Sequence, residues 1–170
     1  MLFHSWPFVV LLLLTLGICA VIPPKSRWLV LLVSSLVFYG WWRVDYLALM
    51  LLTAMSCYVA AIIIEEARME WKRRASVFAV VTTNVAILGL FKYWGLFAEF
   101  VNALSTTGLQ PELGLLLPVG ISFYTFQSIG YAIDVYRRKV SAERNPARFL
   151  LFVCFFPQLV AGPIERATRL

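Results

Sequence analysis

Long apolar runs separated by short charged connections set the strongest limit on what this chain can fold into. Hydrophobic residues make up 61% of its 170 residues, charged residues make up 14%, and the mean hydropathy is +0.81. A soluble domain of this composition has too few polar groups to cover its surface, so lipid must surround much of the chain. The runs predict an all-α, polytopic transmembrane helix bundle. We expect a single membrane domain over residues 1–170, with helices at about 8–22, 28–42, 46–64, 75–95, 117–136 and 149–161.

The basic residues lie between the apolar runs and give a net charge of +6. A nucleic-acid-binding protein collects Lys and Arg along one face of a soluble fold, so we expect contact with the lipid bilayer and none with nucleic acid. An extracytoplasmic N-terminus satisfies the positive-inside rule best, because it places most of the basic residues in the cytoplasm. These residues are Lys25, Arg27, Arg68, Lys72, Arg73, Arg74, Arg137, Arg138, Lys139, Arg144 and Arg148.

The fifth run carries its polar residues on one face. Gly120, Tyr124, Gln127, Tyr131 and Asp134 follow one another at steps of three and four residues, which aligns them in a narrow stripe along a helix. An amide and a carboxylate in hydrocarbon are costly, so this stripe should face other helices or a water-filled cavity.

Asp134 allows two interpretations. In the first, its carboxylate lines a path for a substrate or for protons. In the second, Asp134 lies near the membrane interface and pairs with Arg137 or Arg138.

The last run predicts a kinked or re-entrant helix near the C-terminus. Residues 149–161 number too few to cross a bilayer as one helix. Pro157 also removes a backbone hydrogen bond and clashes with the preceding turn. Broken backbone at membrane depth has to be buried in protein or to line a cavity, so we expect this element beside a functional chamber.

No motif for chemistry is visible in the chain by itself. A nucleophile elbow, a phosphate-binding loop, a zinc motif and a carboxylate pair are all absent from the sequence. The three cysteines are far apart and show no zinc or disulfide spacing, and we assign no role to the single histidine, His4. We therefore predict no catalytic residue and no metal ligand.

Two segments resemble the membrane-bound O-acyltransferase family. They are LPVGISFYTFQSIGYAIDVYRRK (residues 117–139) and FLLFVCFFPQLVAGPIERA (residues 149–167). Their order is most similar to the bacterial branch that contains the alginate O-acetyltransferase membrane component. VSSLVFYGWW (residues 33–42) and LGLFKYW (residues 88–94) resemble the N-terminal helices of that branch. The resemblance covers nearly the whole chain but only the N-terminal portion of the family's fold.

The resemblance implies a central chamber or tunnel and an essential histidine in the later half of the family's fold. No position here matches that histidine, so we expect a fragment that is inactive by itself. It implies that a complete relative transfers acyl groups across the membrane to hydroxyls of an extracytoplasmic polysaccharide such as alginate. Together with the polar stripe, it implies that the chamber is lined by Tyr124, Gln127, Tyr131, Asp134, Pro157, Gly162, Pro163 and Arg166.

The resemblance also implies a setting for the protein. It predicts a multi-pass protein of the bacterial inner membrane. We expect no bound cofactor, but an acyl donor for the full-length protein, either acetyl-CoA or a carrier-linked acyl group. Expected partners are an extracytoplasmic acyltransferase or polysaccharide-export proteins.

Other functions stay open at this point. A relative that transfers D-alanyl groups, or one that acylates peptidoglycan, would share the same motifs. A transporter would explain the polar stripe ending at Asp134, although only one broken helix is visible. A non-catalytic membrane scaffold is the remaining alternative.

Overall fold

The computed structural model describes residues 6–41, 44–104 and 120–161. For residues 159–161 it describes the main chain only. Over these ranges the chain forms helices and no β-strand. The helices are α1 (Trp6–Val21), a 3-10 turn η1 (Pro24–Ser26), α2 (Arg27–Gly40), α3 (Val44–Glu66), α4 (Glu70–Leu104), α5 (Ile121–Tyr136), α6 (Pro146–Cys154) and α7 (Phe156–Ala161).

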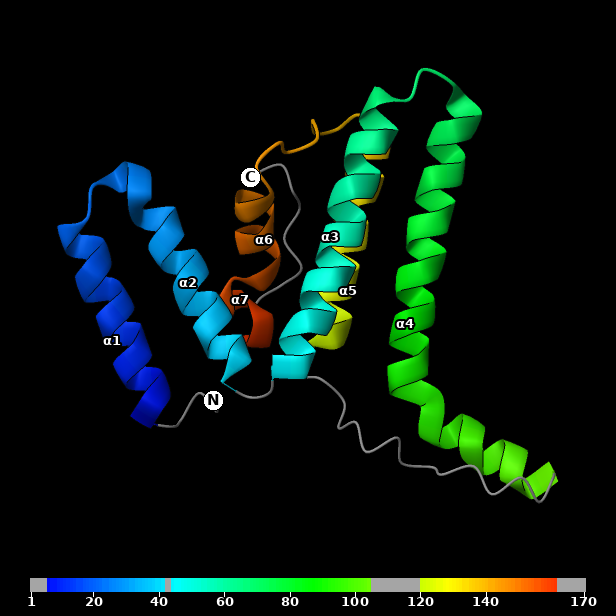
Figure 1. Cartoon of the computed structure of the whole chain (residues 1–170), viewed down its shortest axis with the longest axis horizontal. Coiled ribbons are helices and arrows are strands. Elements are labelled where there is room, and N and C mark those ends of the chain that lie inside the picture. The colour runs from blue at the N-terminus through cyan, green and yellow to red at the C-terminus, as the bar shows by residue number, and fades with distance from the viewer. Residues whose placement is uncertain (1–5, 42–43, 105–119, 162–170) are drawn as a thin grey trace.

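Helix α3 is the centre of the packing, with α5 and α4 against it and α2 and α6 on another side (Figure 1). Helix α1 packs on α2 and lies at the edge of the structure. One stripe of α3 is completely buried, and it contains small side chains that allow neighbouring helices to approach closely. The stripe consists of Met50, Ala54, Cys57, Ala61 and Ile64.

Two helices are long and apolar enough to cross a membrane, namely α3 with 23 residues and α4 with 35. At 1.5 Å per residue they extend about 35 and about 52 Å, against about 30 Å for the hydrocarbon core. Figure 1 shows that the last part of α4 turns away from the other helices. Helix α1 and the segment that contains α6 are apolar but shorter.

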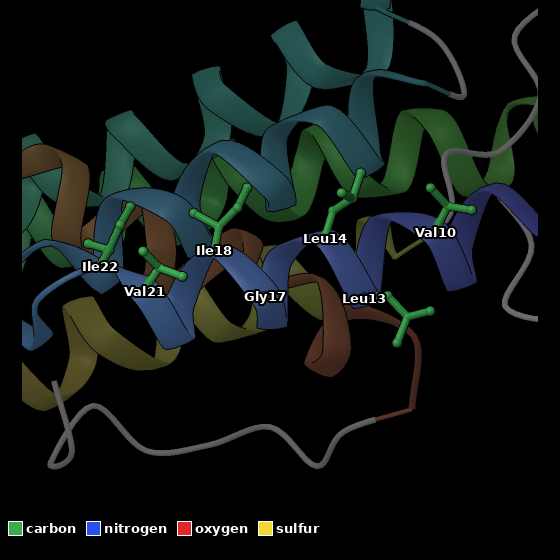
Figure 2. Close-up of a pocket in the computed structure, with 7 residues that line it drawn as sticks. All are labelled: Val10, Leu13, Leu14, Gly17, Ile18, Val21 and Ile22. Atoms are coloured by element: carbon green, nitrogen blue, oxygen red, sulfur yellow. The ribbon is translucent and has the colours of Figure 1, made fainter.

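The outer side of α1 is aliphatic. A shallow cavity of about 630 Å³ lies along it (Figure 2). It is lined by Val10, Leu13, Leu14, Gly17, Ile18, Val21 and Ile22. The polar Thr15 faces the opposite way, where its hydroxyl oxygen lies 2.8 Å from that of Ser34 on α2. A helix with an aliphatic outer side and a polar contact inside suits a lipid environment.

The boundaries of α3 and α4 differ from the prediction. The segment EEARMEWKRR was expected as an aqueous connection, but only residues 67–69 interrupt the two helices. Glu, Ala, Arg, Met and Lys all favour helix, so the helices continue beyond their apolar parts into the charged sequence. Helix α4 also continues to Leu104, although it was predicted to end at about residue 95; residues 105–119 lie outside the described ranges.

Helix α5 starts later than predicted. It was expected from residue 117, with Pro118 in its first turn, but the helix starts at Ile121. Gly120 precedes it with a φ of 78°, a left-handed conformation that glycine adopts readily and that a right-handed helix cannot contain.

Arg73 joins the ends of three helices. Its side chain is 8% exposed, and its guanidinium donates to the carbonyl oxygens of Ile64, in the last turn of α3, and Tyr136, the last residue of α5. It also pairs with Glu70 at 3.1 Å. The last carbonyls of a helix have no partner within it and carry the negative end of its dipole, so a buried arginine is well suited to bind them.

The connection between α5 and α6 is fixed to the same end of α3. Arg144 forms salt bridges of 2.7 Å with both Glu65 and Glu66. Tyr58 donates from its hydroxyl to the Arg144 carbonyl at 2.8 Å. Asn145 then caps α6, because its side-chain oxygen accepts from the amides of Ala147 and Arg148.

We predict that Arg73→Ala lowers the free energy of unfolding by about 2–4 kcal/mol, because it leaves two buried carbonyls and Glu70 without their partner. Arg74→Ala is the matched control: the Arg74 side chain is 73% exposed and lies 3.6 Å from the Glu70 carboxylate. Its removal should cost less than about 1 kcal/mol. Unfolding of both variants in detergent is the measurement, and equal losses would contradict the role given to Arg73.

Candidate functional site

The polar stripe of α5 lies inside the bundle. Tyr124, Gln127 and Tyr131 are at most 2% exposed, and Asp134 is half-buried. Helix α5 can bury this face because α3 and α4 pack along it and α6 contacts it. The structure therefore brings these four predicted residues together along one helix, while their role in lining a chamber stays a prediction.

The last apolar run is broken, and the break lies at Phe155. Helix α6 ends at Cys154, Phe155 is extended with a ψ of 108°, and α7 starts at Phe156. The predicted interruption is confirmed, but it falls two residues before Pro157, which is the second residue of α7. This is a position where the missing N–H of proline costs nothing, so the chain bends before it.

Two neighbouring helices bind the backbone groups that the break separates. In a continuous helix the Phe156 amide would donate to the Phe152 carbonyl. Here Phe156 donates to the Ser35 hydroxyl on α2 at 3.3 Å, and the Phe152 carbonyl accepts from the Gln127 side chain on α5 at 2.6 Å. Ser35 is completely buried and also donates to the Leu31 carbonyl. The broken helix is therefore anchored on both sides by side chains.

The predicted site residues of the last segment are only partly described. The Pro157 side chain is exposed, so it does not face the interior of this structure. Gly162, Pro163 and Arg166 lie outside the described ranges.

Tyr131 has a clear contact at the charged end of α5. Its hydroxyl accepts from the Glu143 amide at 2.8 Å, and its ring lies 4.7 Å from that of Phe149. Tyr131 thus connects α5 to the loop before α6 and to α6 itself. Tyr124 packs its ring edge-on against Tyr39 of α2, with 6.1 Å between centroids.

Of the two interpretations of Asp134, the ion pair is not formed among the described residues. Within the described ranges, no salt bridge joins its carboxylate to Arg137 or Arg138. Both arginines follow the end of α5 and are exposed, and the main-chain oxygen of Asp134 accepts from the Lys139 amide. The other interpretation, a path along the stripe, is not tested by this geometry.

Several buried polar atoms of α5 have no hydrogen-bond partner among the described residues. They are the hydroxyl oxygens of Thr125 and Ser128 and the side-chain oxygen of Gln127. Unpaired buried polar atoms are costly, so they need water, a ligand or polar groups from another segment. Asn84 on α4 adds a fourth such oxygen, while its side-chain amide donates to Ser56 of α3.

Thr125 and Ser128 were not singled out in the sequence. They lie beside the stripe rather than on it, and hydroxyl residues on a membrane helix usually bond to their own backbone. The signal that could have revealed them is the density of polar residues between positions 124 and 128. The polar face of α5 is therefore broader than the predicted stripe.

The fully buried polar groups on this face of α5 are hydroxyls and an amide, and the Asp134 carboxylate is half-buried at its end. No cluster of His, Cys, Asp or Glu that could hold a metal ion occurs in the described part of the chain. Cys57 and Cys154 are buried and free. Such an interior can donate and accept hydrogen bonds along a path.

Comparison of the sequence with known proteins identifies relatives that are named as acetylases and acetyltransferases. No family model and no solved structure matches the sequence. Curated relatives do match it: a probable alginate O-acetylase of Pseudomonas putida is 42% identical over 98% of this chain, and one of Azotobacter vinelandii is 41% identical over 98%. A peptidoglycan O-acetyltransferase of Helicobacter pylori is 36% identical over 81% of the chain.

The chain spans about a third of the length of these relatives, namely 35%, 34% and 30%. This share fits the expected correspondence to the N-terminal portion of the family. The resemblance predicted from the motifs is confirmed: over nearly its whole length, the chain is similar to proteins named as probable alginate O-acetylases.

Proposed function

We propose that this chain forms part of an O-acetyltransferase that modifies hydroxyls of an extracytoplasmic polysaccharide such as alginate. The observation that supports this most strongly is the identity of about 40% to alginate O-acetylases along 98% of the chain. The geometry agrees, because a hydrogen bond joins the two motif segments that carry the resemblance. The Gln127 side chain of the first segment donates to the Phe152 carbonyl of the second.

Within such an enzyme, the chain would supply the scaffold and one wall of the chamber. The unpaired oxygens of α5 are suited to bind the hydroxyls of a sugar or the polar part of an acyl donor. The donor would be acetyl-CoA or a carrier-linked acyl group. The base that deprotonates the acceptor hydroxyl would come from outside these residues, as the family's histidine does.

We propose a multi-pass arrangement in the bacterial inner membrane with the N-terminus outside. The connections α1–α2, α3–α4 and α5–α6 lie at the same end of the structure (Figure 1). Contacts between them agree, since Arg144 binds Glu65 and Glu66, and Arg148 lies over the Trp28 ring at 5.7 Å. These connections carry the basic residues that the positive-inside rule assigns to the cytoplasm. Partners for export or final transfer would then act at the opposite end.

A second candidate acceptor is peptidoglycan, which the relative from Helicobacter pylori favours. The two acceptors differ in the product, because one reaction acetylates alginate and the other acetylates the cell wall. Acetyl analysis of both polymers from the same cells distinguishes them.

We predict that a chimera restores acetylation. In it, this chain replaces the matching third of the Pseudomonas putida relative, in a strain that lacks its own alginate O-acetylase. The 42% identity between the two segments should let the chimera fold as the relative does, so the alginate should regain acetyl esters, while residues 1–170 alone should give none. A chimera that reaches the membrane at the normal level but leaves alginate unacetylated would contradict the proposal.

Within that chimera, we predict that Gln127→Leu lowers both stability and acetylation. It leaves the buried Phe152 carbonyl without its donor, a loss of about 1–3 kcal/mol. The matched control is Phe126→Leu, because Phe126 is the preceding residue and is 47% exposed. Thermal unfolding and alginate acetyl content are measured for both. An unchanged Gln127→Leu variant would show that this contact is dispensable.

A further inference from the structure

A second cavity lies at the charged end of the bundle, where α3, α4 and α5 meet the loop that follows α5. Its volume is about 320 Å³, at the lower end of the range for small-molecule sites. Two valines form part of its wall. The polar lining consists of Glu65, Arg73, Arg138, Lys139 and Ser141.

The charges in this cavity do not balance. Glu65 is bound by Arg144 and by the Ala142 amide, and Arg73 is paired with Glu70 and two carbonyls. Arg138 and Lys139 form no salt bridge within the described ranges. The cavity therefore holds two positive charges without a protein partner, which favours an anionic ligand.

The backbone of Arg138 is unusual. Its φ is 57°, the only positive value among the described residues other than glycine. The Arg138 amide donates to the Val135 carbonyl, and the Lys139 amide donates to the Asp134 carbonyl. This is the pattern that ends a helix with a left-handed residue, a position that glycine normally fills at no steric cost. An arginine held here against its conformational preference points to a role for its side chain.

We propose that this cavity is a phosphate-binding site in which Arg138 and Lys139 bind the anion. The phosphate could belong to an anionic lipid or to a soluble phosphorylated molecule. The valine wall and the position at the helix ends suit a lipid headgroup at the membrane surface, where basic pockets bind anionic lipids. This inference goes beyond the proposed acetyltransferase function and does not rest on it.

Arg138→Gly provides a sharp test, because glycine fits the left-handed position and the fold should lose nothing. Arg137→Gln is the matched control: it removes one positive charge from the adjacent residue, which does not line the cavity. The melting temperature of Arg138→Gly in uncharged detergent should equal or exceed that of the unchanged chain.

Binding is measured by native mass spectrometry and thermal shift of the 170-residue chain with three probes: phosphatidylglycerol, phosphatidylcholine and inorganic pyrophosphate. A lipid site predicts preference for phosphatidylglycerol, weakened about fivefold or more by Arg138→Gly and little by Arg137→Gln. A site for soluble phosphates predicts the same pattern with pyrophosphate. The proposal is overturned if neither anion binds, or if Arg138→Gly and Arg137→Gln weaken binding equally.

Discussion

The hydrogen bond from the Gln127 side chain to the Phe152 carbonyl is the interaction on which the arrangement of this chain depends. An apolar environment offers no water to bind free backbone groups, so a helix can break there only where side chains replace the lost bonds. Gln127 supplies the donor from α5, and Ser35 supplies the acceptor from α2. The same two contacts position α6 and α7 against the centre of the bundle. The polar face of α5 and the broken helix therefore depend on each other, because Gln127 on that face binds the carbonyl that the break leaves free.

The charged end of the bundle is ordered by similar contacts. Arg73 binds the final carbonyls of α3 and α5, and Arg144 binds the acidic pair that ends α3. These contacts hold the loop between α5 and α6 in place, which keeps the broken helix aligned with α5. The loop in turn carries Arg138 and Lys139 into the second cavity. The connections at this end of the protein are therefore held in place by hydrogen bonds and salt bridges, and together they carry a positively charged surface.

The sequence predicted most of the architecture because its signals are local. Steps of three and four residues were enough to group Tyr124, Gln127 and Tyr131 on one face, and Pro157 was enough to predict an interrupted helix. The position of the break and its two partners depend on contacts between α2, α5 and α6, which no local pattern reveals. The extent of the connection between α3 and α4 was overestimated, because helix propensity carries both helices into the charged segment and only residues 67–69 interrupt them. Of the two interpretations of Asp134, the ion pair is not formed among the described residues, because Arg137 and Arg138 follow the turn that ends α5.

The most direct measurement is solid-state nuclear magnetic resonance of the protein in bilayers, with ¹⁵N in glutamine side chains and ¹³C in phenylalanine carbonyls. A nitrogen 2.6 Å from the Phe152 oxygen should produce strong dipolar dephasing, and Gln127→Leu should abolish it. Dephasing that is absent from the unchanged protein, or that persists in the Gln127→Leu variant, would contradict the anchoring of the broken helix by α5.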